Sequence, residues 1–354
     1  MVASNHSIID ESWPLDGLER VDACPYCSST ARKVAYRDVQ DWSFYCAPGK
    51  WTYWDCNECG TLYLDPRPTK ASIGRAYSIY YTHGASHRGQ ILSFGKTLVR
   101  NLCYFAWYGI ALRPRIALPG FMYPLLSVFR PHIEPPSFIL RKLNQLPRGK
   151  VIDVGCGEGL FLDAAKQLGW DTLGIELDPE AVKVARTSGH EVVQGTYEVC
   201  DVYDNQIDCI ICSHVLEHVH APKALLAVLS RALKVGGVAL ISLPNAGSIV
   251  RRTVQENWRG LEAPRHLAIP RLEGLLEAAR AAGFEKEASF VSRFETLDAS
   301  LVIAQQRGAD MPALIRKVVI MQDGASKVTE TDSDFINLIL KKVVVPNSQP
   351  VPRV

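Results

Sequence analysis

The sequence predicts an α/β fold in which helices cover both faces of a mainly parallel sheet. From about Arg148 onward, short apolar runs typical of strands alternate with segments of helical spacing, as in successive βαβ units. The first run, 150–154, ends in a glycine-rich turn, and a helical segment follows at 160–168. At 354 residues, the chain is long enough for two domains or for one domain with additions.

The same alternation continues toward the C-terminus. Further strands are expected at 172–176, 191–193, 207–212 and 238–243, and further helices at 179–188, 222–233 and 272–282. A last pair of strands is expected near 286–293 and 299–304, with short helical patterns at 314–321 and 335–340. An alternative interpretation is that 296–345 forms helices inserted before a missing final strand.

The segment Val151-Ile-Asp-Val-Gly-Cys-Gly-Glu-Gly159 combines a buried strand with a glycine-rich turn. Its three glycines allow a tight turn and let a ligand approach the backbone without meeting a Cβ atom. The helix at 160–168 would direct its positive N-terminus to the same point. Glu176 ends the next strand, where a doubly wound fold places the acid that binds ribose hydroxyls. Together these features predict a site for a nucleoside ligand.

The glycine spacing narrows the choice of nucleoside. Dinucleotide-binding turns follow G-x-G-x-x-G because a helix N-terminus must receive a pyrophosphate. This chain has G-x-G-x-G, with the carboxylate of Glu158 inside the turn. A ligand with a positive centre and no phosphate suits such a turn better than a phosphate does.

Asp153, the glycines and Glu176, followed by Ile207-Asp-Cys-Ile-Ile-Cys-Ser-His-Val-Leu-Glu-His-Val219, resemble the class I S-adenosylmethionine (SAM) methyltransferases. The resemblance implies a Rossmann-like sheet of seven strands. It also implies that Asp153 and the turn hold the methionine end of SAM, that Glu176 binds the ribose and that Leu177 flanks the adenine. The implied cofactor-binding residues are Asp153, Gly155, Cys156, Gly157, Gly159, Glu176, Leu177 and Ser213. The alternative is a Rossmann-like domain whose glycines serve only packing.

Candidate catalytic residues follow the strand at 207–212. His214, Glu217 and His218 would lie at its carboxyl end, which opens onto the active crevice in this fold class. Histidine suits a general base because its unperturbed pKa lies near neutrality. Alternatively, His218 and Glu217 are structural groups that hydrogen-bond near the start of a helix.

His266 is the fourth candidate. It ends the segment Trp258-Arg-Gly-Leu-Glu-Ala-Pro-Arg-His266, between the predicted strand 238–243 and the next helix, where acceptor-side residues usually lie. Members of the resembled family show a similar Trp…Pro-x-His pattern. The alternative is that Trp258 packs in the core and His266 caps the helix that follows.

Two C-x-x-C pairs near the N-terminus predict a structural Zn²⁺ site. Cys24-Pro-Tyr-Cys27 and Cys56-Asn-Glu-Cys59 have the spacing that turns two thiolates onto one metal. The intervening Trp51-Thr-Tyr-Trp54 has the composition of a strand, and Cys46 is a spare thiol. Disulfide and redox roles are the alternatives. The stretch from Cys59 to Pro68 resembles the zinc-binding preface of bacterial SAM methyltransferases that act on sugars, lipids and natural products.

These patterns divide the chain into four predicted parts: a zinc-ribbon-like module (1–69), a helical, aromatic-rich cap (70–145), the SAM-binding domain (146–306) and a C-terminal extension (307–354). Within the cap, the uncharged runs of 91–129 are too short to span a bilayer. This stretch is interpreted either as a helical cap over the substrate pocket or as an interfacial surface for peripheral membrane contact.

Composition excludes several other classes. Hydrophobic residues make up 47% and charged residues 21% of the chain, as in ordinary soluble proteins, and a net charge of +2 gives no basis for nucleic-acid binding. The first eleven residues lack the apolar core of a secretory signal. Cysteines within apolar strands favour a reducing compartment, so a cytoplasmic location is expected, with peripheral membrane contact under the interfacial interpretation of 91–129.

The function expected from these observations is SAM-dependent methylation, with the oxygen of a glycan-type or lipid-linked small molecule as acceptor. The glycan preference rests on the family resemblance alone. An alternative is a C-methyltransferase of a nucleotide-linked deoxysugar. An alternative of another class is a non-catalytic zinc-ribbon protein whose methyltransferase fold is a relic.

Overall fold

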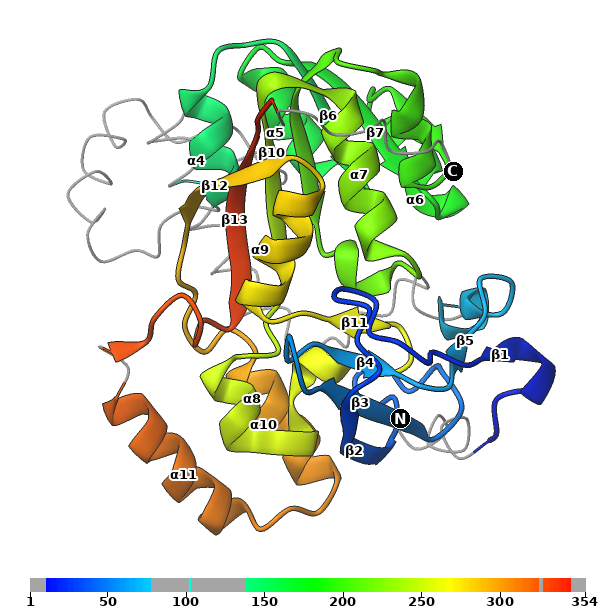
Figure 1. The fold of residues 1–354 in the computed structure, drawn as a ribbon, viewed down its shortest axis with the longest axis vertical. Helices are drawn as coiled ribbons and strands as arrows, with labels where there is room; N and C mark the ends of the chain where they lie inside the picture. The colour runs from blue at the N-terminus through cyan, green and yellow to red at the C-terminus, as the bar shows by residue number, and fades with distance from the viewer. Residues whose placement is uncertain (1–10, 78–101, 103–137, 325–326, 345–354) are drawn as a thin grey trace. The chain divides into compact units, whose positions relative to one another are not determined.

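The computed structural model describes residues 11–77, 102, 138–324 and 327–344 (Figure 1). The chain divides into two compact units. The first unit comprises 1–81, 212–230 and 241–354, and the second comprises 82–211 and 231–240. The chain therefore crosses between the units several times, within strands β9 (Ile207–Ser213) and β10 (Leu233–Pro244) among other places.

A seven-stranded sheet confirms the predicted α/β class. Its strand order is β12-β13-β10-β9-β6-β7-β8. β6 pairs with β7 and β7 with β8 in parallel, whereas β12 and β13 form an antiparallel pair at one edge. The strands not yet given bounds are β6 (Lys150–Val154), β7 (Asp171–Glu176), β8 (Val192–Gln194), β12 (Phe284–Ser289) and β13 (Phe335–Lys342).

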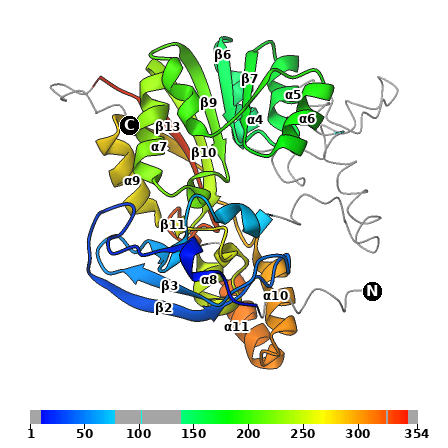
Figure 2. The same cartoon turned by 90° about the vertical axis from the view of Figure 1, so that its right-hand side faces the viewer.

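In the second unit, α5 (Leu160–Gln167) and α6 (Pro179–Thr187) pack against β7, and α4 (Phe138–Gln145) packs against α5 (Figure 2). Asp178 is the N-cap of α6, because its side chain accepts hydrogen bonds from the amides of Glu180 and Ala181. A small apolar core lies beneath the glycine turn, formed by Cys156, Leu162, Val182, Ala185 and Val192. Here the predicted strands and helices agree with the structure to within about two residues.

The first unit contains a four-stranded antiparallel sheet in the order β11-β4-β3-β2. β3 (Trp51–Cys56) confirms the strand expected at 51–54, and it lies between β2 (Arg32–Val39) and β4 (Leu62–Leu64). β11 (Ala268–Ile269) joins the sheet from far along the chain, so the N-terminal module and the loop before residue 268 share one core. Short elements complete this part: η1 (Leu15–Gly17), β1 (Leu18–Glu19), β5 (Arg67–Pro68) and η2 (Ile73–Tyr77).

The remaining elements are α7 (Pro222–Ala232), α8 (Ile249–Val254), α9 (Leu272–Ala281), α10 (Leu297–Gln306), α11 (Met311–Asp323), and the 3-10 turns η5 (Tyr197–Val202), η6 (Leu216–His218), η7 (Gln255–Asn257) and η8 (Arg259–Leu261). Among the described residues, no helix has the length and apolar character that crossing a membrane requires. The predicted contact segment 91–129 lies, apart from residue 102, outside the described residues.

The C-terminal region corrects the sequence prediction. The strand expected at 299–304 is wrong, because that stretch lies within α10, and the helix expected at 335–340 is wrong, because it forms β13. The partner of β12 is therefore β13, which lies beyond two inserted helices. The alternative interpretation foresaw these helices but not the final strand. The backbone groups of 335–342 form their hydrogen bonds by pairing with β12. The local sequence pattern gives no sign of this pairing.

Candidate functional site

The glycine turn after β6 has the backbone that its sequence predicts. Gly155, Gly157 and Gly159 have φ values of +73°, +53° and +89°, in the left-handed region that other residues rarely adopt. A Cβ at Gly159 would lie 2.7 Å from Cδ2 of His190, so this position excludes a side chain on two grounds. Gly157 has no neighbouring atom within 4 Å of such a Cβ, which leaves its backbone open to a ligand.

Glu176 links this turn to the loop after β7. Its Oε2 accepts a hydrogen bond from the Gly157 amide at 2.8 Å, and its Oε1 accepts from the amides of Leu177 and Asp178 at 2.7 and 2.9 Å. A carboxylate has about four acceptor positions, and these three bonds leave one of them, on Oε2, for a ligand hydroxyl. The exposed side chain of Leu177, with 65% of its surface accessible, lies beside this carboxylate in the sequence.

Asp153 is the penultimate residue of β6 and a buried acid, with 2% of its surface exposed. Its Oδ2 has no hydrogen-bond partner among the residues that the structure describes. Burial, and secondarily the charge of Glu176, raise the pKa of Asp153 well above its usual value. A cationic ligand would offset this cost, and SAM carries both a sulfonium and an ammonium group. The Cys156 side chain is buried, and burial raises the pKa of its thiol, so it packs rather than reacts.

The four predicted catalytic residues lie in the first unit. His214 Nδ1 lies 3.2 Å from Glu217 Oε1, and the His218 and His266 rings meet edge to face with centroids 4.7 Å apart. His214 has φ of +56°, which is uncommon for a residue with a side chain and is typical of functional sites. Ser213, assigned above to SAM, is the last residue of β9 and is half-buried beside this group in the sequence.

The environment gives these groups different proton affinities. The side chain of His214 is 48% exposed, and the protein around it still tends to lower its pKa, but the hydrogen bond to Glu217 outweighs that effect and the net pKa is raised. Burial tends to raise the pKa of Glu217, yet His214 and then His218 lower it, so Glu217 is held as a carboxylate. Burial lowers the pKa of His266 to about 4, so this imidazole is neutral at neutral pH.

Several residues that hold this group were missed in the sequence analysis. The Tyr77 hydroxyl lies 3.0 Å from His218 Nδ1, and the Tyr53 hydroxyl contacts the carbonyl oxygen of His266 at 2.7 Å. Arg265, fully buried, pairs with Asp41 at 2.5 Å. The two tyrosines and Asp41 lie far from the histidines in the sequence, so spacing could not reveal them. Arg265 could have been suspected, because it directly precedes His266.

Trp258 takes the packing role that was considered as an alternative, and Cys46, the spare thiol, lies outside the group formed by the other four N-terminal cysteines. Trp258 is 1% exposed, and its indole N–H donates to Thr296 Oγ1 at 3.1 Å, so it packs rather than lining an acceptor site. Cys46 Sγ lies within 3.5 Å of Asp41 Oδ2 and of the Ala76 carbonyl oxygen, away from the other N-terminal cysteines.

Cys24, Cys27, Cys56 and Cys59 converge as the sequence predicts, and we call them the four-cysteine cluster. Sγ atoms are 3.5 Å apart between Cys24 and Cys59, and 3.4 Å apart between Cys27 and Cys56. These separations are too long for disulfides and close to the ~3.8 Å between sulfurs around a tetrahedral Zn²⁺. The hydrogen bond between Cys24 and Cys59 lowers the pKa of Cys59 and raises that of Cys24, as expected when two neighbouring thiols share one proton. The residues therefore fit a structural zinc ion.

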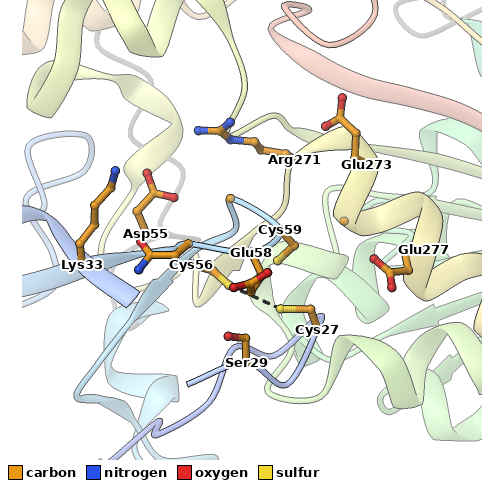
Figure 3. A pocket seen from close by; sticks show the side chains of 13 residues that line it. Cys27, Ser29, Lys33, Asp55, Cys56, Glu58, Cys59, Arg271, Glu273 and Glu277 are labelled. Atoms are coloured by element: carbon orange, nitrogen blue, oxygen red, sulfur yellow. Dashed lines mark hydrogen bonds between the residues drawn. The ribbon is translucent and has the colours of Figure 1, made fainter. Parts of the chain in front are cut away.

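A cavity of about 730 Å³ adjoins the four-cysteine cluster (Figure 3). Its walls carry Lys33 and Arg271 together with the acids Asp55, Glu58, Glu273 and Glu277. Gly60, which follows the second cysteine pair, has φ of +67°, and a Cβ there would lie 2.4 Å from Arg271 Nε. Gly60 therefore makes a tight turn after Cys59 that a residue with a side chain could not make without displacing Arg271.

One segment of the chain, which includes the glycine turn, matches a known protein family. Residues 131–289 match a family model described as a methyltransferase domain. The glycine turn, β7 with Glu176, and β9 all fall within the matched residues. The sheet order and the mainly parallel pairing are those of the class I SAM-dependent methyltransferase fold predicted above.

Curated relatives match this domain over shorter stretches. A ubiquinone biosynthesis O-methyltransferase of Xanthomonas campestris pv. campestris is 40% identical over 107 residues, 28% of this chain and 45% of the relative. A protein of the same name from Idiomarina loihiensis is 34% identical over 138 residues, 37% of this chain and 54% of the relative. The chain spans about half the length of the curated relatives it matches.

Solved structures also resemble the chain. A SAM-dependent methyltransferase from Thermotoga maritima has 26% sequence identity and a TM-score of 0.35, and the match covers 42% of this chain and 70% of that one.

Proposed function

We propose that this protein is a SAM-dependent methyltransferase that methylates an oxygen atom of a small acceptor. The observation that carries the proposal is the glycine turn braced by Glu176, with the buried acid Asp153 at its start. The turn offers bare backbone for close approach, and the two acids favour a ligand that is positively charged and bears hydroxyls. SAM has both properties, whereas the pyrophosphate of a dinucleotide would meet the carboxylate of Glu158 inside the turn.

The transfer itself is an in-line displacement. A lone pair of the acceptor oxygen attacks the methyl carbon, the carbon–sulfur bond breaks, and neutral S-adenosylhomocysteine leaves with the electron pair. The acceptor loses a proton to a general base, which we assign to His214. Its Nδ1 faces Glu217 at 3.2 Å, so the carboxylate stabilises the imidazolium formed when Nε2 takes the proton. Support for this role comes from the raised pKa of His214 and its half-exposed side chain.

The choice of an oxygen acceptor is supported by the relatives named O-methyltransferases, whose names also refer to ubiquinone biosynthesis. The family resemblance of the N-terminal module favours a glycan-type or lipid-linked acceptor instead. We therefore propose an acceptor panel with three arms: ubiquinone precursors, nucleotide sugars and lipid-linked glycans. The nucleotide-sugar arm also tests the carbon-methylation alternative, because the position of the new methyl group is read from the product.

We further propose that the four-cysteine cluster binds one structural Zn²⁺. A shell of four thiolates has no open position, so this ion would stabilise the N-terminal module and take no part in methyl transfer.

The donor site is tested by calorimetric titration of the full chain with SAM and with S-adenosylhomocysteine. We expect micromolar binding of both, and at least tenfold weaker binding by Glu176→Gln, because an amide lacks the charge and one acceptor oxygen. Glu180→Gln, an exposed acid on α6 in the same unit, is the matched control and should bind as the wild type does. A folded wild-type protein that binds neither compound would refute the proposal and favour the relic alternative.

A further inference from the structure

Glu217, His218 and His266 form a group that proton transfer alone does not explain. One ligand atom from each of the three lies within 4.8 Å of those of the other two. Glu217 and His218 come from the 3-10 turn η6, and His266 comes from the loop before β11. All three belong to the first unit of the chain.

The hydrogen bonds of the two histidines fix which ring nitrogens carry hydrogen. His266 Nδ1 lies 2.7 Å from the Gly260 carbonyl oxygen, and His218 Nδ1 lies 3.1 Å from the Arg265 carbonyl oxygen. A carbonyl oxygen can only accept, and the Tyr77 hydroxyl, 3.0 Å from His218 Nδ1, can accept as well as donate, so all of these contacts are satisfied when each Nδ1 carries the proton. In the neutral rings each Nε2 then holds a lone pair. This is the arrangement in which a backbone carbonyl orients a metal-binding histidine.

Glu217 supplies the negative charge. Its side chain is fully buried, and Oε1 is engaged by His214. Oε2 is also buried and has no hydrogen-bond partner among the described residues. A buried carboxylate oxygen without a partner is costly, and a cation placed beside it would remove that cost.

A second carboxylate lies near His266 but is already satisfied. Glu262 Oε2 lies 3.7 Å from His266 Nε2, beyond hydrogen-bond distance. Glu262 is paired with Arg259 and, at 3.0 Å, with Arg265. Glu217 is therefore the carboxylate of this group that has an oxygen without a hydrogen-bond partner among the described residues.

We propose that Glu217, His218 and His266 bind a divalent metal ion. Two imidazoles and one carboxylate suit Zn²⁺, Mn²⁺, Co²⁺ or Fe²⁺, and three protein ligands leave positions open. If the proposed methyl transfer is correct, an acceptor oxygen would occupy an open position, where the cation lowers the pKa of its hydroxyl. Metal binding itself does not depend on that function.

Mn²⁺ is the probe that separates this site from the four-cysteine cluster, because it prefers oxygen and nitrogen ligands to thiolates. The full chain, with its cysteines loaded with zinc, is titrated with Mn²⁺ while the electron paramagnetic resonance signal of free Mn²⁺ is followed. We expect about one bound Mn²⁺ per chain, and at least tenfold weaker binding by Glu217→Gln and by His266→Gln. Glu277→Gln, an acid that lines the cavity beside the cysteines, is the control for adventitious surface binding and should match the wild type.

A measurement on the wild type keeps the test decisive if a variant fails to fold. Pulsed electron paramagnetic resonance of the bound Mn²⁺ should show coupling to two imidazole nitrogens. Absence of Mn²⁺ binding, binding without nitrogen coupling, or folded Glu217→Gln and His266→Gln proteins that bind like the wild type would each overturn the inference. SAM titration of the same samples separates the two proposals. Binding of SAM without Mn²⁺ refutes only the metal site, whereas binding of Mn²⁺ without SAM refutes only the proposed function.

Discussion

The glycine turn and the histidine–glutamate group differ in how far along the chain their contacts reach. Glu176 and Gly157 are 19 residues apart and are joined by one βαβ unit. His218 meets the carbonyl of a residue 47 positions away and a tyrosine 141 positions away. The turn is thus built by local backbone requirements, whereas the second group exists only because distant segments pack together.

This difference affects how each site responds to mutation. A local turn is sensitive to the backbone freedom of its own residues, and changes there should stay confined to the second unit. A long-range group depends on buried pairs that hold loops together, so it is most sensitive at residues that touch no ligand. The predictions below test this contrast.

The largest effect is expected at the four-cysteine cluster, which joins two local pairs over a long interval. Cys56→Ser should reduce the zinc content of the full chain from about one ion to near zero and unfold the module, because three thiolates do not complete the shell. Cys46→Ser, at a cysteine outside the cluster, should keep its zinc. Elemental analysis with circular dichroism measures both. Equal zinc in the two variants would contradict the assignment.

Arg265 should be the most sensitive residue outside any metal site. Arg265→Ala leaves Asp41 buried without its partner and should destabilise the first unit by about 3–5 kcal/mol. Arg231→Ala removes a pair of similar length, at 2.5 Å to Asp201, but those side chains are 25% and 32% exposed. Its cost should be about 0–1 kcal/mol. Hydrogen exchange of the β3 and α7 amides compares the two variants. A similar loss of protection in both would contradict the role assigned to burial of the Arg265 pair.

Within the glycine turn, two substitutions separate backbone strain from steric exclusion. Gly159→Ala combines a left-handed φ with the His190 ring at 2.7 Å, and should cost about 2–4 kcal/mol. Gly157→Ala meets no atom within 4 Å, so only the strain of about 1–2 kcal/mol remains. Hydrogen-exchange rates of the α5 and β6 amides measure the destabilisation in both variants. A larger loss for Gly157→Ala would show that the turn is not shaped by the contact with His190.

The smallest effect is expected at Leu177. Its exposed side chain contributes little to folding, so Leu177→Ala should leave the melting temperature within about 1 °C. If Leu177 flanks the adenine, SAM binding should weaken about three- to tenfold through lost apolar contact. Calorimetric titration of this variant and of Glu176→Gln with SAM shows which of the two residues contributes more to SAM binding. Unchanged affinity would remove Leu177 from the proposed site.

The sequence by itself determined the features that depend on local backbone chemistry. The left-handed glycines, the acid ending β7, the N-cap at Asp178 and the knuckle spacing of the cysteines each follow from residues within one or two turns of chain. The α/β class was predictable for the same reason, because alternating strand and helix patterns are local signals.

Only the tertiary structure decided the rest. It replaced the strand expected at 299–304 with α10 and paired β12 with β13, because a strand edge can bond to any segment that the fold delivers. It brought His266 beside His218 and buried Arg265 against Asp41, contacts with no signature in the local sequence. The physical reason is that such contacts depend on which distant surfaces are buried together, and neither spacing nor propensity encodes that choice.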